Sequence, residues 1–175
     1  RLEETYQIER VITFNNSKGN FRKLLDPNYK ANRKKQEHPK LLFEMHEHIA
    51  EIYSTKNSYG VETDDLVATY WKTLTDELGH NNVIIVSLDK DYKQLPCLMY
   101  NYHYKHQEII DISPYDALYN FYEQMIVGDS ADNVNYCKGY GKVYAKKLFK
   151  DCKTHYQFTK KTYELFKTIY KSKAK

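Results

Sequence analysis

The sequence predicts an α/β fold in which helices flank a mostly parallel sheet, followed by a basic helical module. Residues 83–88 form a continuous apolar run, which is typical of a strand buried on both faces of a parallel sheet. Helical patterns at residues 41–56 and 63–78 alternate with predicted strands, and this alternation favours stacked layers of helix and sheet. From residue 129 onward the chain has no convincing strand pattern, so we predict an appended helical region there.

The first predicted strand covers residues 8–14, where a β-branched Val-Ile-Thr stretch precedes a polar Asn-Asn-Ser-Lys-Gly loop. Residues 21–40 are basic, contain Pro27 and Pro39 and lack a sustained period, so we predict a mobile segment. Residues 41–56 repeat apolar side chains at the spacing of a helix. These side chains are Leu41, Leu42, Met45, Ile49 and Ile52.

The second predicted helix begins at an N-cap, Thr63, and ends before Gly79, because glycine often terminates helices. Its predicted buried stripe consists of Leu66, Val67, Tyr70, Trp71, Leu74 and Leu78. Pro114 opens a third helix, which we expect to reach about Val127.

We expect two domains, residues 1–127 and residues 128–175, in a soluble globular protein. Hydrophobic residues make up 41% of the chain, and no run approaches the roughly 20 apolar residues that a membrane helix needs. The three cysteines stand far apart without a CxxC pair, so we expect neither a disulfide framework nor a zinc site. An intracellular location is therefore predicted, in the host cytoplasm if a phage encodes the chain. Because the chain opens at Arg1 without Met, we expect it to be part of a longer protein.

Charge is distributed unevenly along the chain. Residues 60–132 carry 13 acidic side chains against 4 basic ones, whereas residues 133–175 carry 12 lysines against 2 acids. Residues 1–59 are weakly basic, with 11 basic and 8 acidic side chains. Carboxylates that collect cations, flanked by lysines that hold phosphates, are what a metal-using enzyme acting on a polyanion needs. Ordinary solvated charge remains the alternative, above all for the final lysines.

Acidic residues stand at three predicted element junctions. They are Glu62, Asp64 and Asp65 at a helix start, Asp89 and Asp91 after the buried strand, and Asp129 with Asp132 after the third helix. The helix dipole alone explains acids at a helix start, and turns after strands favour Asp. However, ligands of open α/β sheets bind beyond the carboxyl ends of the strands, where the second group is expected.

Crowded carboxylates repel one another and raise one another's pKa unless a cation binds them. Oxygen-only ligands suit Mg²⁺ or Mn²⁺ rather than zinc. Two such ions can activate water and stabilise the leaving oxygen in phosphodiester hydrolysis. Together, the three acidic groups predict a site for two divalent cations.

Four ordered stretches resemble the motifs of one family, the flap endonucleases and 5′→3′ exonucleases. Gly-Val-Glu-Thr-Asp-Asp-Leu at 60–66 resembles its Gly-x-Glu-Ala-Asp-Asp-Leu, and the sequence at 87–95 resembles its Ser-x-Asp-Lys-Asp-x-x-Gln-Leu. Gly-Asp-Ser-Ala-Asp-Asn-Val at 128–134, followed by Gly-Tyr-Gly-Lys, resembles its Gly-Asp-Ser-x-Asp-Asn-Ile and Gly-Ile-Gly-x-Lys. Phe21-Arg22 and Tyr-Lys-Ala-Asn-Arg at 29–33 resemble its Phe-Arg and Tyr-Lys-x-Asn-Arg.

The resemblance implies a resolvase-like, PIN-like core with a C-terminal helix–turn–helix element that grips duplex DNA. It makes metal ligands, or close neighbours of metal ligands, of all seven acids named above. It assigns Lys30 and Arg33 to the scissile phosphate, whose developing charge they would stabilise, and makes Tyr29 available to stack on an unpaired base.

The family's DNA contacts fall on a second set of residues. The resemblance implies contacts from Arg22 and from the main-chain amides at Gly139 and Gly141, with added charge from Lys142, Lys146 and Lys147. Bound K⁺ at this turn is a further option, and a simple helix–helix turn is the alternative. The expected substrate is DNA with a free or displaced 5′ end, or an RNA–DNA hybrid, cut during replication or repair without membrane association.

Two departures from the family pattern keep other functions open. First, the family carries a metal-binding Asp on its first strand, and we expect that strand to precede this chain. Second, the family tends to have Asp at the position where this sequence has Asn15. A catalytically silent DNA-binding relative therefore stays possible. A PIN-type ribonuclease shares the acidic pattern but normally lacks the glycine turn and the Tyr-Lys-x-Asn-Arg motif.

Overall fold

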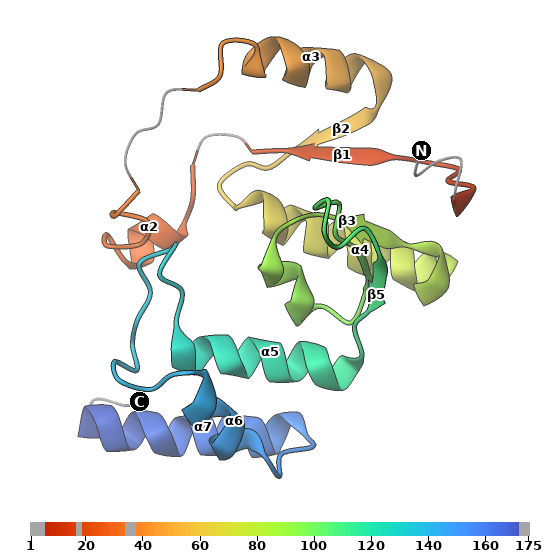
Figure 1. Ribbon diagram of the computed structural model, residues 1–175. Coiled ribbons are helices and arrows are strands. Elements are labelled where there is room, and N and C mark those ends of the chain that lie inside the picture. Colours follow the sequence, from red (N-terminus) through yellow and green to blue (C-terminus); the bar gives the residue numbers. More distant parts are fainter. Residues whose placement is uncertain (1–5, 17–18, 34–37, 172–175) are drawn as a thin grey trace. The chain divides into compact units, whose positions relative to one another are not determined.

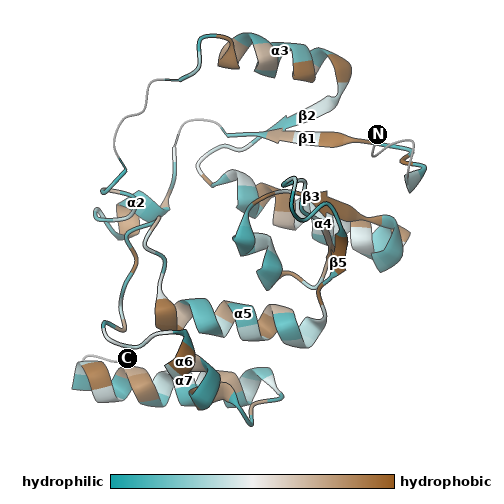
Figure 2. Cartoon of the chain, in the orientation of Figure 1, coloured by the Kyte–Doolittle hydropathy of each residue, from teal (hydrophilic) through white to brown (hydrophobic). Residues whose placement is uncertain are grey.

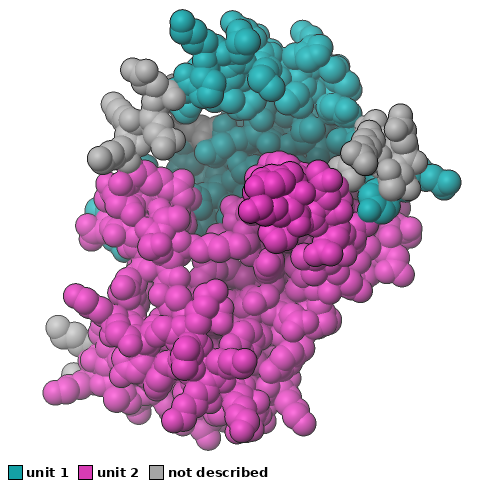
Figure 3. All heavy atoms as spheres, viewed as in Figure 1, with its two compact units in different colours: residues 1–27, 34–70 teal, residues 28–33, 71–175 magenta. Residues whose placement is uncertain are grey.

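The computed structural model describes residues 6–16, 19–33 and 38–171, which form two compact units (Figures 1 and 3). Unit 1 takes its described residues from 1–27 and 34–70, and unit 2 from 28–33 and 71–175. Each unit has its own small sheet, so the chain is an α/β protein. The expected division into domains of residues 1–127 and 128–175 stays a prediction.

Unit 1 is built on two parallel strands, β1 (Ile12–Asn15) and β2 (Ser54–Asn57). The helix α3 (Leu42–Ile52) connects them and contacts both, as a crossover between parallel strands requires. The hydroxyl groups of Thr13 and Thr55, which are register partners, share a 2.6 Å hydrogen bond. The unit also contains the short helix α2 (Arg22–Leu25) and the first half of α4 (Thr63–Leu78).

The sheet of unit 2 has three strands, β3 (Ile84–Val86), β4 (Leu98–Tyr100) and β5 (Ile109–Asp111). β3 pairs with β4 in parallel, and β4 pairs with β5 antiparallel. Two 3₁₀ helices flank β3: η1 (His80–Asn82) and η2 (Lys90–Gln94). Asp89 and Asp91 follow β3 directly. Because β3 and β4 are parallel, these two acids lie at the carboxyl end of the strand pair.

Three helices complete unit 2 and form its main core: α5 (Pro114–Val127), α6 (Lys142–Phe149) and α7 (His155–Tyr170). The core consists of Tyr122, Ile126, Cys137, Ala145, Phe149, Cys152, Phe158 and Leu165. Local capping fixes where the helices begin. Ser113 accepts a hydrogen bond from the Asp116 amide, and Thr154 forms a capping box with Gln157. Apolar and polar residues alternate around α5 and α7, as expected of amphipathic helices (Figure 2).

The long predicted helices agree best with the structure. α5 has the predicted limits, and α4 ends at Leu78 before Gly79, whose φ of 88° is unfavourable for other residues. The predicted N-cap Thr63 is wrong, because this residue is already helical. Leu78 was also wrongly placed in the buried stripe, since it is 54% exposed.

The predicted strands and the first predicted helix need larger corrections. The helix predicted for residues 41–56 ends at Ile52, and residues 54–57 form β2 because they pair with β1. The strand predicted for residues 83–88 is shorter and is not buried on both faces, since Val86 is 51% exposed. The predicted mobile segment contains α2, while its residues 34–37 and loop residues 17–18 lie outside the described ranges.

All three cysteines are free and buried. Among the described residues, no helix is both long and apolar enough to span a bilayer.

Candidate functional site

The first acidic group lies at the start of α4 in unit 1, where its members are bonded to one another. The amide of Glu62 donates to Asp65 Oδ2 at 3.1 Å, and the amide of Asp65 donates to Asp64 Oδ1 at 3.0 Å. These bonds satisfy main-chain donors at the helix start, where the helix dipole also favours acids. The carboxylates of Asp64 and Asp65 therefore bind main-chain donors at the helix start, as helix capping would require.

Two side chains at the start of α2, from Asn20 and Arg22, bind part of this group. The Arg22 guanidinium binds Asp65 through two hydrogen bonds of 2.6 and 2.7 Å and lies 3.8 Å from Glu62. The Asn20 amide donates to Glu62 Oε1 at 2.7 Å. Burial raises the pKa of Asp64, and the charges of Glu62 and Asp65 raise it further. A bound cation would offset the repulsion that Asp64 receives from these two neighbours.

The second acidic group begins η2, directly after β3 in unit 2. Asp89 Oδ1 accepts a 3.0 Å hydrogen bond from the Asp91 amide, and Ser87 Oγ accepts one from the Asp89 amide, also at 3.0 Å. Asp91 is half-buried against α5, and burial together with the charges of Asp89 and Asp129 raises its pKa.

The third group lies on the turn after α5. Gly128 ends the helix, and Asp129 forms an isolated bridge with Val134 through two 2.8 Å main-chain hydrogen bonds. Asp129 is only 6% exposed. Its carboxylate accepts hydrogen bonds from Lys90 Nζ at 2.9 Å and the Ala131 amide at 2.8 Å. Burial acts to raise the pKa of Asp129, but these two donors outweigh it and hold that pKa below its usual value.

Asp91 and Asp129 share a donor that the sequence motifs did not indicate. The Nε2 atom of Gln124, on α5, donates to Asp91 Oδ1 at 3.0 Å and to Asp129 Oδ2 at 3.2 Å. Two of the predicted ligands therefore lie beside each other in unit 2. The sequence contains only a weak signal for the role of Gln124, namely its place on a predicted helix five residues before Asp129.

Asp132 lies against the predicted phosphate-binding residues. Its carboxylate accepts hydrogen bonds from Tyr29 Oη at 2.9 Å and from Arg33 at 2.7 Å, and it lies 3.6 Å from Lys30 Nζ. Main-chain contacts strengthen this docking, because the Lys30 amide donates to the Asp132 carbonyl at 2.8 Å. The Tyr-Lys-Ala-Asn-Arg segment and the acidic turn are therefore one structural element of unit 2.

The predicted DNA-binding turn lies between α5 and α6. Gly139 has a φ of 92°, and Gly141 is the N-cap of α6; an added Cβ would meet open space at both. Lys142 is exposed and lies 3.9 Å from Glu123, and Lys146 and Lys147 are exposed on the same helix. The main chain at this turn is accessible, as a phosphate contact would require.

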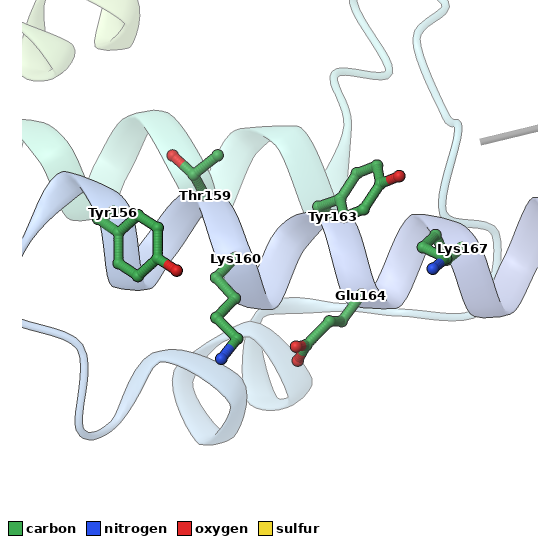
Figure 4. Close-up of a pocket in the computed structure, with 6 residues that line it drawn as sticks. All are labelled: Tyr156, Thr159, Lys160, Tyr163, Glu164 and Lys167. Atoms are coloured by element: carbon green, nitrogen blue, oxygen red, sulfur yellow. The ribbon is translucent and has the colours of Figure 1, made fainter. Parts of the chain in front are cut away.

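A separate shallow hollow lies along the outer face of α7 (Figure 4). It is lined by Tyr156, Thr159, Lys160, Tyr163, Glu164 and Lys167. The motifs predicted none of these residues, and one acid between two lysines gives the hollow little net charge.

The candidate metal ligands are distributed over both units, three acids in unit 1 and four in unit 2. Within the described ranges, no three His, Cys, Asp or Glu side chains are grouped as a metal ion would require. All seven candidates are carboxylates, so the donor chemistry fits hard cations such as Mg²⁺ and Mn²⁺.

Comparison with known proteins identifies the class. Residues 1–120 match the family described as 5′-3′ exonuclease, N-terminal resolvase-like domain, and the chain belongs to this family. The predicted resemblance is confirmed. A search of curated protein sequences found no match.

Solved structures of bacteriophage T5 proteins share the fold. One T5 protein co-crystallised with metal ions has a TM-score of 0.72 and 18% identity, with 97% of this chain and 76% of that chain covered. The T5 flap endonuclease in a complex with DNA and metal ions has a TM-score of 0.68 and 18% identity, over 96% and 76% of the two chains. T5 5′-exonuclease with bound zinc has a TM-score of 0.69 and 19% identity, over 96% and 75%.

Proposed function

We propose that this chain is a divalent-metal-dependent 5′-nuclease that hydrolyses phosphodiester bonds in DNA with a free or displaced 5′ end. One observation carries the proposal beyond family membership: Asp91 and Asp129, from two separate motifs, meet at the same amide group of Gln124. Capping would explain either acid alone, but it gives no reason for two acids from distant motifs to lie together.

The proposed metal ligands are the seven carboxylates of the three acidic groups. They are Glu62, Asp64, Asp65, Asp89, Asp91, Asp129 and Asp132. Mg²⁺ or Mn²⁺ ions held by such ligands supply an activated water and stabilise the leaving oxygen of the phosphodiester. The raised pKa of Asp64 and of Asp91 supports a cation site, because a bound cation would relieve the repulsion that contributes to both shifts.

The basic residues are proposed to bind the substrate. Lys30 and Arg33 would hold the scissile phosphate, and their contact with Asp132 keeps them at the acidic turn. Tyr29 is only 9% exposed, so the proposed stacking on a base needs a movement of its segment. Arg22 is already bound to Asp65, so its contact with DNA would add to that ion pair.

The turn before α6 is proposed to bind duplex backbone. The amides at Gly139 and Gly141 would approach phosphate, and Lys142, Lys146 and Lys147 would add charge. A helix–turn–helix element, bound K⁺, an RNA–DNA hybrid substrate and a role in replication or repair belong to the same proposal. Support comes from the T5 flap endonuclease, whose structure was determined with DNA and metal ions.

The proposal is tested by cleavage of a 5′-labelled flap duplex with Mg²⁺ and with chelator. We expect metal-dependent products at the flap junction or the 5′ end, and a loss of at least about 100-fold in Asp89→Ala, as is usual when electrostatic groups of an active site are removed. Asp76→Ala is the matched control, because Asp76 is an exposed acid on α4 paired with Lys72. Cleavage in chelator, or full activity of Asp89→Ala, would contradict the proposal.

A catalytically silent DNA-binding relative is the second candidate, and Asn15 favours it. Asn15 ends β1 and is the register partner of Asn57. The family tends to have Asp at the position of Asn15, so a neutral amide stands here in place of a carboxylate. Duplex binding without cleavage, together with cleavage gained in Asn15→Asp, would establish this alternative. Faster cleavage of single-stranded RNA than of the flap duplex would instead indicate a PIN-type ribonuclease.

A further inference from the structure

We infer that Gln124 is a positioning residue, which fixes Asp91 and Asp129 relative to each other for cation binding. The inference rests on the proposed function, because it concerns the same carboxylates. Gln124 belongs to none of the acidic or basic motifs, and it contributes a neutral side chain between two charged ones.

The geometry gives each carboxylate one of the two amide hydrogens. Gln124 Nε2 is 3.0 Å from Asp91 Oδ1 and 3.2 Å from Asp129 Oδ2. The distance between these two carboxylate oxygens therefore cannot exceed the sum of the two hydrogen-bond lengths. A carboxylate has about four lone-pair sites, so each acid keeps acceptor capacity for a cation. The amide thus limits the spacing of two ligands without occupying them fully.

The orientation of the Gln124 amide is fixed from its other side. The Gln94 amide nitrogen donates to Gln124 Oε1. The oxygen end of the amide is therefore engaged, and the NH₂ end must face the two acids. Gln94 ends η2, which also contains Asp91, so one short element supplies both a ligand and the group that orients its partner.

The main chain of Gln124 supports the same arrangement. Its carbonyl accepts a 2.7 Å hydrogen bond from the amide of Gly128, which ends α5 directly before Asp129. Ile126, two residues further along α5, has no exposed surface, so this end of the helix is held in the core. The side chain and the main chain of Gln124 both fix the start of the acidic turn.

The neutrality of Gln124 distinguishes it from Lys90, the other side chain that bonds Asp129. The Lys90 side chain carries a positive charge, so it competes with a metal ion for the Asp129 carboxylate. It is also 65% exposed, so it can move into solvent when a cation binds. The Gln124 amide offsets part of the repulsion between the acids but adds no charge that a cation must displace. Partners that orient ligands in this way typically change metal affinity about 10–100-fold when removed.

The test compares Gln124→Leu with Asn120→Leu by titration of Mn²⁺, followed by electron paramagnetic resonance, without DNA. Leu has a similar volume and no donor. Asn120 lies one turn earlier on α5 and donates to the Lys93 carbonyl at 2.9 Å, so its loss removes a contact with η2 but leaves the acids bonded to Gln124. We expect the Kd for Mn²⁺ to rise about 10–100-fold in Gln124→Leu and less than about twofold in Asn120→Leu.

Two further readouts separate positioning from stability. The Tm in chelator should fall no more in Gln124→Leu than in Asn120→Leu, and cleavage of the flap duplex should recover at high Mn²⁺. Unchanged Mn²⁺ affinity in Gln124→Leu, in a chain that binds Mn²⁺ and cleaves, would overturn this inference alone. If the unaltered chain neither binds Mn²⁺ nor cleaves, both this inference and the proposed function are overturned.

Discussion

Gly128 leaves no room for a side chain between α5 and the acidic turn. Its φ is 75°, and an added Cβ would lie 2.2 Å from the Val134 carbonyl oxygen and 3.1 Å from the Asn135 Cα. Both neighbours are main-chain atoms, so they cannot rotate away as the end of a side chain would. Any other residue must displace the bridge between Asp129 and Val134.

We predict that Gly128→Ala lowers the free energy of unfolding by about 2–4 kcal/mol, because a left-handed conformation and a main-chain clash act together. Gly139→Ala should lower it by about 1 kcal/mol, since its φ of 92° is unfavourable but the space is open. Gly141→Ala, with an ordinary φ of −107°, is the control and should change it by less than about 0.5 kcal/mol. Urea unfolding measures all three, and equal losses at Gly128 and Gly141 would contradict the clash.

Asp64 gives a prediction with a definite pH dependence. Its pKa is raised by burial and by two neighbouring acids, so the folded chain binds a proton there more readily than the unfolded chain. The stabilisation from protonated Asp64 is complete below the unfolded pKa of about 3.8 and is lost as the pH rises through the folded pKa. Near pH 7 and without metal, the charged side chain is therefore unfavourable in the folded state.

We predict that Asp64→Asn raises the Tm by about 2 °C at pH 7 in chelator, which is a usual gain from relieving a charge repulsion. The gain should vanish near pH 3, where Asp64 is protonated in both states. Asn keeps an oxygen to accept the 3.0 Å hydrogen bond from the Asp65 amide. Thermal unfolding at the two pH values checks this, with Asp76→Asn as an exposed control; a lower Tm at pH 7 would refute the repulsion.

At the scale of elements, strong terminal signals made α4 and α5 predictable. Pro114 and Gly79 act locally, so they mark a helix limit without knowledge of its partners. The strands are three or four residues long, and β2, β4 and β5 owe their existence to pairing with a neighbour. A short apolar run cannot reveal that pairing, so β2 was predicted as helix and the other two were missed.

We predict that Phe158→Ala lowers the free energy of unfolding by about 3–5 kcal/mol, because this fully buried side chain of α7 packs against aromatic rings of α5 and α6. Phe158 has no exposed surface and contacts the rings of Tyr122 and Phe149 at centroid distances of 5.2 and 5.0 Å. Tyr156→Ala, at a position that is 73% exposed on the same helix, should change it by less than about 0.5 kcal/mol. Urea unfolding followed by circular dichroism compares the two, and similar losses would show that α7 does not depend on this core.

At the scale of the whole molecule, the motifs identified the family and the positions of the acids but not what each acid contacts. Arg22 was expected to contact DNA, and in the structure it binds Asp65. Asp132 was expected to bind a metal ion, and in the structure it also binds Arg33 of the basic segment at residues 29–33. Gln124 was not predicted, because a neutral residue in a helix carries no motif, and its role depends on η2 packing against α5. Motif spacing reports chemistry along the chain, whereas contacts such as these depend on the tertiary fold.

The uneven charge distribution leads to a prediction about DNA binding by the whole chain. Residues 133–175 carry 12 lysines against 2 acids, and Lys142, Lys146 and Lys147 are exposed on α6. Each phosphate contact to duplex DNA contributes about −0.9 to the slope of log K against log salt concentration. Replacing the three lysines by Ala should therefore reduce the magnitude of the slope by about 2–3, with weaker binding to every duplex sequence.

Fluorescence anisotropy of a labelled duplex, in chelator to prevent cleavage, measures the slope in each variant. Lys105→Ala is the control, because Lys105 lies on the loop between β4 and β5 and is exposed without belonging to the basic region. It should leave the slope unchanged within about 0.3, well below the contribution of one phosphate. A triple variant with the slope of the unaltered chain would show that α6 does not face DNA, because lost phosphate contacts must reduce counterion release whatever the sequence bound.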